Sequence, residues 1–246
     1  MPTRAMTGSN WTGREMCWRH APDEYGAIHF HDDDIDDARW EVDFTFDVPD
    51  LIKSGIYAAR LRINGEDSPE TEDFIPFVIK PPKGKATSKT LFVLPSNSYM
   101  AYSNDKLGTN SVVAQLLAGK VPVMSAADLY LNEHREYGLS TYSLHSDGSG
   151  VCYSSRLRPI LNMRPKYRHW LSPSLWQLNG DLLLTDWLEE KNLDFDVVTD
   201  EDLHIEGVDL LNRYRCVLTG SHPEYSSEKM IAAYESYQLN GGRWIY

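Results

Sequence analysis

The 246-residue chain is poor in cysteine and has no long apolar run. Its three cysteines, Cys17, Cys152 and Cys216, are widely scattered. They form neither a disulfide framework nor a Cys-x-x-Cys metal pair, which predicts a reducing, cytoplasmic location. No apolar stretch approaches the roughly 18 residues of a membrane-spanning helix, and the residues after Met1 lack the apolar segment of a secretory signal. The sequence therefore predicts neither membrane insertion nor secretion.

Basic residues are also scarce. The chain has 24 Lys and Arg residues against 36 Asp and Glu residues, which gives a formal net charge of −12. This balance opposes nucleic-acid binding as the main activity, because clustered Lys and Arg supply the affinity for phosphate. Hydrophobic residues make up 41% of the chain and charged residues 24%, which is typical of a folded globular protein and excludes disordered and fibrous classes.

The first third of the chain has the period of β-structure. Apolar and polar residues alternate over residues 40–48 and again over residues 55–63, and a third strand is predicted over residues 74–79. Pro76 restricts that third strand to an edge or a bulge. Short strands with no helical pattern between them predict a small β-sandwich segment over residues 1–82.

After a linker at residues 83–89, the pattern changes to α/β. Short apolar runs at residues 90–95, 195–199 and 216–219 predict buried parallel strands. A helix is expected over residues 178–193, and Ser226 or Ser227 can cap another that ends before Asn240-Gly241-Gly242. For the first helix, the spacing predicts that one face carries the apolar side chains of Leu182, Leu183, Trp187 and Leu188.

A last strand is expected from residue 243, and the chain stops at its fourth residue. A core strand usually has about 5–6 residues and a covering helix after it. The α/β domain of residues 90–246 is therefore expected to be incomplete at its C-terminus, as part of a longer polypeptide or one that needs a partner. Its unpaired strand edge predicts association into oligomers.

Two segments have an unusual charge. Residues 23–47 hold ten acids and one basic residue, with His29 and His31 among them. The glycine and the terminal glutamate of an EF-hand loop are absent, so this segment is interpreted as a solvated, structural loop. Residues 148–180 hold no acid but several basic and aromatic residues. Such a mixture can bind single-stranded nucleic acid, but in an acidic chain it favours contact with another domain or an acidic subunit. Its length also fits a loop over a site.

The turn at residues 219–225 is the strongest local signal for a site. It follows a predicted buried strand and precedes a helix, so His222 and Glu224 should lie at the carboxyl edge of the sheet, where α/β folds place their sites. These side chains could be metal ligands or acid–base groups. An ordinary helix-entry turn, with Glu224 near the positive end of the helix dipole, explains the same residues equally well.

Five stretches carry a resemblance to a known family. They are YGAIHFHDDD at 25–34, LSTY at 139–142, SDGSGVC at 146–152, DVVTDEDLH at 196–204 and TGSHPEY at 219–225. On these residues the chain resembles the large (β) subunit of N,N-dimethylformamidase. That subunit is considerably longer than 246 residues. The resemblance implies that residues 90–246 adopt a fold similar to class I glutamine amidotransferases.

The resemblance also implies a mononuclear Fe(III) held by two tyrosinates and one glutamate. Carried over by motif, the ligands fall on Tyr102, Tyr142 and Glu224, with Tyr99 a weaker candidate for the place of Tyr102. His222 would orient a ligand or stabilise developing negative charge. The residue types suit the ion, because Fe(III) prefers anionic oxygen donors and its charge can ionise a phenol whose free pKa is about 10.

The implied activity is hydrolysis of a small N-substituted formamide to formate and amine, with a small α subunit and further copies of the chain as partners. The general base, a glutamate, and an assisting asparagine are expected beyond Tyr246. Two alternatives remain open at this point. The chain could be a non-catalytic binding or scaffold module, or it could serve the hydrolysis of a different amide.

Overall fold

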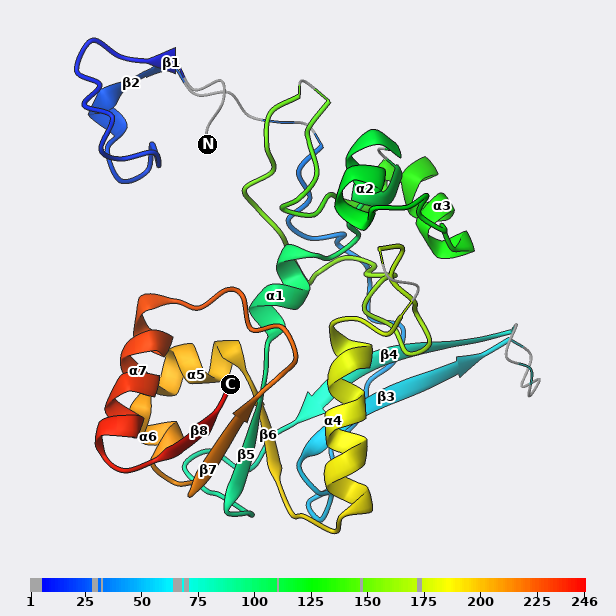
Figure 1. The fold of residues 1–246 in the computed structure, drawn as a ribbon, viewed down its shortest axis with the longest axis vertical. Coiled ribbons are helices and arrows are strands. Elements are labelled where there is room, and N and C mark those ends of the chain that lie inside the picture. Colours follow the sequence, from blue (N-terminus) through cyan, green and yellow to red (C-terminus); the bar gives the residue numbers. More distant parts are fainter. Residues whose placement is uncertain are drawn as a thin grey trace. The chain divides into compact units, whose positions relative to one another are not determined.

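The computed structural model describes residues 6–27, 31, 33–63, 68, 71–109, 111–146, 148–171 and 174–246 (Figure 1). The chain divides into two compact units. Unit 1 comprises Met1–Trp40, Met100–Asn162 and His169–Pro173, and unit 2 comprises Glu41–Tyr99, Met163–Arg168 and Ser174–Tyr246. The predicted division into segments 1–82, 83–89 and 90–246 stays a prediction.

Unit 2 contains a four-stranded parallel sheet. Its strands are β5 (Thr90–Leu94), β6 (Asp196–Thr199), β7 (Cys216–Thr219) and β8 (Arg243–Ile245), in the order β6-β5-β7-β8 (Figure 1). Every neighbouring pair is parallel, with Leu91 opposite both Asp196 and Val217. The predicted parallel strands and the α/β class are thereby confirmed.

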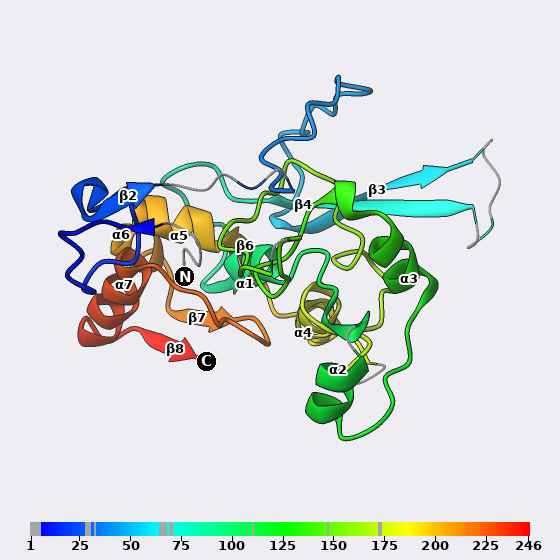
Figure 2. The same ribbon diagram turned by 90° about the horizontal axis from the view of Figure 1, so that it is seen from above.

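Helices cover the sheet. Three of them, α5 (Asp200–Glu206), α6 (Val208–Leu211) and α7 (Glu228–Leu239), pack on one face, and α4 (Leu178–Glu190) lies on the other side of the sheet (Figures 1 and 2). Removal of apolar side chains from water stabilises this packing. The core beneath α5, α6 and α7 is formed by Leu91, Val93, Val198, Leu203, Leu210, Leu211, Tyr214, Val217, Met230, Ala233, Tyr234 and Tyr237.

Local capping defines the helix ends. The Ser227 side chain accepts a hydrogen bond from the Met230 amide at the start of α7, so the structure selects Ser227 over Ser226 as the cap. At the other end Gly241 has a φ of 85°, a left-handed conformation that glycine adopts without strain. The helix predicted between these residues is confirmed.

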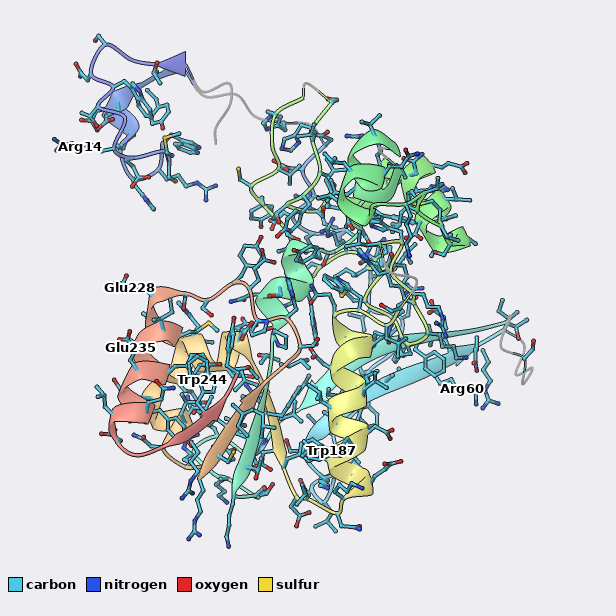
Figure 3. The ribbon with its side chains drawn as sticks, in the orientation of Figure 1. Arg14, Arg60, Trp187, Glu228, Glu235 and Trp244 are labelled. Carbon is cyan, nitrogen blue, oxygen red and sulfur yellow. The ribbon has the colours of Figure 1, made fainter. Side chains whose placement is uncertain are left out.

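The buried face of α4 matches the predicted one only at Leu188. Leu178, Asp181, Thr185 and Leu188 are buried along one helical stripe. By contrast, Trp187 (labelled in Figure 3) is 49% exposed. Apolar residues surround much of this helix, so spacing alone could not select the face. An acid within the buried stripe was the available signal, and it was missed.

Two of the predicted β-strands form a hairpin in unit 2. Strand β3 (Gly55–Arg62) pairs antiparallel with β4 (Glu72–Ile79), and Gly55 lies opposite Ile79. Pro76 is accommodated because this sheet has only two strands. The hydroxyl of Ser54, just before β3, donates to the carbonyl of Val197 and accepts from its amide, which joins the hairpin to β6.

The strand predicted over residues 40–48 is wrong. The structure describes all nine of these residues, and none of them is in a strand. The side chains at alternate positions are exposed, Val42 at 78%. An alternating pattern produces a strand only where a partner ladder and a core surface are present. The described part of residues 1–82 forms two separate two-stranded sheets, β3-β4 and the pair β1 (Met6–Thr7) and β2 (Tyr25–Ala27), rather than a sandwich.

The remaining elements are short. They are α1 (Ser96–Ala101), α2 (Ser111–Ala118), α3 (Ala126–Glu133) and the 3₁₀ turns η1 (Pro22–Glu24), η2 (Leu107–Thr109) and η3 (Arg135–Tyr137). Buried polar groups hold the loops between them. The Asn104 side chain donates to the carbonyls of Tyr137 and Pro159.

Within the described residues, no helix is both long and apolar enough to cross a membrane.

The acid-free segment at residues 148–180 makes contacts inside the chain. Arg164 and Lys166 pair with Asp73 and Glu72 of β4. Arg158 is buried in unit 1, where it donates to the carbonyl of Ser155, and this burial lowers the pKa of its guanidinium to about 10. These three basic side chains therefore stabilise the fold of the chain itself.

Candidate functional site

The carboxyl edge of the parallel sheet brings two loops of unit 2 together. The strand order reverses between β5 and β7, so the chain leaves these strands in opposite directions, the arrangement at which open α/β sheets form their ligand crevices. Helix α1 starts after β5, and the turn with Glu224 follows β7. The Glu224 amide donates to Ser98 Oγ at 2.9 Å, and Asn97 Nδ2 donates to the Tyr225 carbonyl at 3.1 Å.

His222 and Glu224 interact on this turn. His222 Nε2 lies 3.0 Å from Glu224 Oε2, and both side chains are about one third exposed. The ring of Trp176 lies beside the imidazole, with 5.0 Å between the centroids. The Ser98 hydroxyl therefore holds the backbone of Glu224 and the imidazole contacts its carboxylate, while the His222–Glu224 pair stays open to solvent.

A buried carboxylate holds the turn from below. Asp181 of α4 is 0% exposed and accepts hydrogen bonds from the Tyr99 hydroxyl and the Ser221 amide. Burial raises the pKa of Asp181, although these hydrogen bonds oppose the shift. Burial and the neighbouring Asp181 carboxylate also raise the pKa of Tyr99 well above its ordinary value. The Tyr99 hydroxyl therefore keeps its proton and donates it in a hydrogen bond to Asp181. This makes Tyr99 a poor candidate for a tyrosinate ligand.

A second buried acid, Asp200, directly follows β6 at the same edge. Its carboxylate accepts from the Asn97 amide at 3.0 Å, and its own amide donates to Ser96 Oγ. Burial, together with the charge of Asp181, raises the pKa of Asp200 to about 7. Sequence reasoning missed this residue, although an acid placed directly after a buried strand was a usable signal.

In unit 1 the two predicted tyrosine ligands lie together. The rings of Tyr102 and Tyr142 stack with centroids 4.2 Å apart and planes 18° from parallel. Thr141 anchors the second tyrosine, because its amide and its hydroxyl both donate to the Ala101 carbonyl at 3.0 Å. On the other side, Asn162 Nδ2 donates to the Tyr102 carbonyl at 2.7 Å.

The structure thus brings together Tyr102 with Tyr142, and His222 with Glu224. The first pair belongs to unit 1 and the second to unit 2. Their union in one ligand set stays a prediction.

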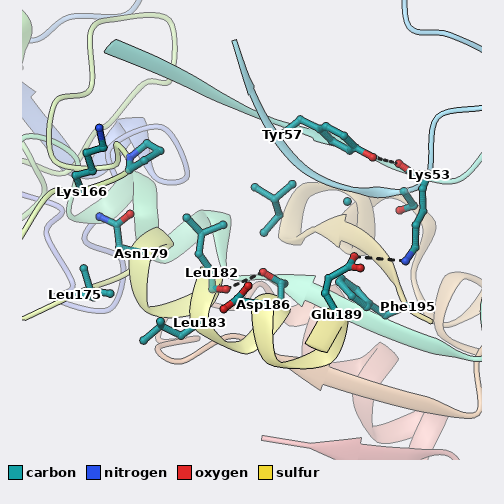
Figure 4. Close-up of a pocket in the computed structure, with 15 residues that line it drawn as sticks. Lys53, Tyr57, Lys166, Leu175, Asn179, Leu182, Leu183, Asp186, Glu189 and Phe195 are labelled. Carbon is teal, nitrogen blue, oxygen red and sulfur yellow. Dashed lines mark hydrogen bonds and ion pairs between the residues drawn. The ribbon is translucent and has the colours of Figure 1, made fainter. Parts of the chain in front are cut away.

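A pocket of about 540 Å³ lies elsewhere in unit 2 (Figure 4). Its wall combines apolar side chains with charged ones, and Lys53 Nζ contacts Glu189 Oε1 at 3.4 Å across it. The residues labelled at its wall include Tyr57, Leu182, Leu183, Asp186 and Phe195. None of the four predicted site residues lines it, so its size alone does not make it the candidate site.

Comparison with known proteins agrees with the motifs. The chain is 46% identical over 246 residues to the N,N-dimethylformamidase beta subunit of Paracoccus aminophilus, and 45% identical to that of Alcaligenes sp. In both cases all of this chain is covered, and it spans 32% of the relative's length. A family profile described as N,N-dimethylformamidase beta subunit-like, C-terminal, matches residues 3–246. The chain belongs to this N,N-dimethylformamidase beta subunit-like family.

Proposed function

We propose that this chain supplies the iron ligands of an amide hydrolase that cleaves a small N-substituted formamide to formate and an amine. The observation that carries the proposal is the 46% identity to a named N,N-dimethylformamidase beta subunit over the whole chain. The geometry of the two predicted pairs is consistent with it. The name of the relatives also supports a partner subunit, and we propose a small α subunit together with further copies of the chain.

The donor set suits a hard ion. Two adjacent phenols, Tyr102 and Tyr142, and the carboxylate of Glu224 would offer three anionic oxygens to Fe(III). Three protein ligands leave positions for substrate and water. When bound, the ion would supply Lewis acidity toward the amide carbonyl oxygen and lower the pKa of a bound water.

The other groups of the turn orient and stabilise. His222 contacts Glu224 at 3.0 Å and so restrains the carboxylate, as residues next to metal ligands commonly do. Its imidazole can also donate a hydrogen bond to developing oxyanion charge. Asp181 fixes the turn through the Ser221 amide, which limits the movement of His222 and Glu224 relative to α4.

Iron content, colour and amide hydrolysis together test the proposal. The purified protein is expected to hold one iron per chain and to absorb visible light through phenolate-to-iron charge transfer. Release of dimethylamine from N,N-dimethylformamide is expected from the longer subunit that also carries the general base. Tyr142→Phe keeps the ring but removes an anionic donor. It is expected to lower iron affinity by about tenfold or more, and the band and the activity with it.

Tyr153→Phe is the matched control, because Tyr153 is a partly exposed tyrosine of the same unit whose hydroxyl contacts Asp36 at 2.6 Å. It is expected to leave iron, colour and activity unchanged. Full iron content and an unchanged band in Tyr142→Phe would contradict the ligand assignment. A wild-type protein that holds no iron would favour the scaffold alternative.

A further inference from the structure

A cluster of two histidines and an aspartate lies in unit 1 and includes none of the residues assigned to the ferric site. His31, Asp34 and His145 each offer a ligand atom, and these three atoms lie within 4.8 Å of one another. Residues 31 and 34 come from the acidic segment, whereas His145 lies on the loop after Tyr142. We propose that these three side chains form a second metal site, for a divalent ion of the zinc type.

His145 is held as a metal-binding histidine is. Its side chain is 2% exposed, and its Nδ1 lies 2.6 Å from Asp33 Oδ1. A hydrogen bond from Nδ1 to a carboxylate fixes the tautomer, so that Nε2 carries the lone pair a metal needs. The carboxylate of Asp33 is itself fixed by the Ser146 amide at 3.0 Å and by Arg135 at 3.2 Å.

Asp33 is placed to support a metal ligand. A carboxylate that accepts a hydrogen bond from the second nitrogen of a ligating imidazole orients the ring and raises the basicity of the ligating nitrogen.

The distances around His145 Nε2 fit an ion better than a hydrogen bond. Asp34 Oδ1 lies 3.8 Å from this nitrogen, beyond hydrogen-bonding distance. Two ligands at about 2.0–2.2 Å from one tetrahedral ion are themselves about 3.4 Å apart. A movement of a few tenths of an ångström would bring this pair onto a metal. Asp34, whose side chain is 38% exposed, leaves a path for entry.

His31 completes the set after a rotation. Its ring is stacked on that of His145, with centroids 3.6 Å apart and planes 6° from parallel, and its Nε2 lies 2.7 Å from Ser149 Oγ. A metal binds in the plane of each imidazole, so the stack must open when both rings ligate one ion. The two rings lie parallel in this structure, and their planes would have to incline to each other to bind one ion.

The donor types select the ion class. Two imidazole nitrogens and one carboxylate oxygen match the ligands of Zn²⁺ in open sites, with water in the fourth position. The proposed ferric ligands are all oxygens. The two sites therefore differ in donor chemistry and should differ in the metal they retain.

Titration of the purified protein with Zn²⁺ tests this site without any use of activity. Wild type is expected to bind one equivalent through the cluster. Asp34→Asn, at a part-exposed position that should leave the fold intact, is expected to weaken binding by about tenfold or more. Asp37→Asn, a neighbouring acid outside the cluster, is expected to bind as wild type does. His145→Gln is a second test, with circular dichroism as a check that it folds.

Replacement of Zn²⁺ by Co²⁺ should give a visible ligand-field spectrum that is lost in Asp34→Asn. Tyr142→Phe should retain this binding, since the cluster does not include Tyr142, and that result separates the cluster from the ferric proposal. Equal Zn²⁺ affinity in wild type and Asp34→Asn would overturn the inference, and so would loss of Zn²⁺ binding in Tyr142→Phe. Absence of stoichiometric binding in wild type would show that the cluster is a hydrogen-bonded structural group.

Discussion

Gly220→Ala should destabilise the turn that carries His222 and Glu224. A Cβ at residue 220 would lie 2.5 Å from Asp181 Oδ2 and 2.5 Å from Pro95 Cδ. Non-bonded atoms prefer separations of about 3.5–4.0 Å, so each contact is about 1 Å too close. Asp181 cannot easily turn away, because its oxygens accept from the Tyr99 hydroxyl and the Ser221 amide. Pro95 has a rigid ring and leads directly from β5.

Overpacking of a tight site costs about 1–3 kcal/mol, and the fixed neighbours place this case at about 2–3 kcal/mol. For a chain of this size that corresponds to a fall in Tm of about 4–12 °C, measured by calorimetry or circular dichroism. Gly150→Ala is the matched control, because nothing lies within 4 Å of its added Cβ, and its Tm should stay within about 2 °C of wild type.

A double-mutant cycle tests the cause of the effect. Asp181→Ala removes the clashing Oδ2 and Cγ atoms and leaves only Pro95 Cδ. Gly220→Ala should therefore cost less in that background, a coupling expected between residues in contact. A Gly220→Ala protein that melts within 1 °C of wild type (against about 4 °C or more expected) would refute the close packing of the turn. A cost that is unchanged in the Asp181→Ala background would show that Pro95 alone sets it.

Two further predictions concern other parts of unit 2. Ser227→Ala should lower the free energy of unfolding by about 1 kcal/mol because it removes the cap of α7, whereas Ser226→Ala should change it by less than about 0.5 kcal/mol; equal effects in urea titrations would contradict the cap. Asp200 has a folded pKa of about 7, above the unfolded value. Between about pH 4 and pH 7 the unfolded chain loses this proton while the folded chain keeps it, so the free energy of unfolding falls as the pH rises. Asp200→Asn, neutral throughout, should therefore gain stability relative to wild type by up to about 1.4 kcal/mol per pH unit across that window and level off above pH 7. Parallel unfolding profiles at pH 5, 6, 7 and 8 would contradict the burial effect.

Local sequence signals predicted the secondary structure where the local preference and the tertiary environment agree. The apolar run of β5, a serine cap at residue 226 or 227 and the stop at Gly241 each depend on a few neighbouring residues. Backbone sterics, capping hydrogen bonds and continuous apolar runs determine these strands and helix ends, and all three depend on residues that are adjacent in the sequence.

The failures share one physical cause. Alternation over residues 40–48 specifies which side chains would face a core, but among the residues that the structure describes no strand pairs with this segment. In α4 the apolar residues cover more than one face, and packing on the sheet buried Asp181 and Leu188 while it left Trp187 largely exposed.

The candidate site divides in the same way. His222 and Glu224 are two residues apart on one turn, so their contact follows from the sequence once the strand before them is recognised. Three other contacts join segments that are 40 to 114 residues apart in the sequence. They are the stack of Tyr102 on Tyr142, the hydrogen bond from Ser221 to Asp181 and the stack of His31 on His145. Only tertiary structure could decide these contacts, because long-range contacts depend on loop closure and on packing that involves the whole chain.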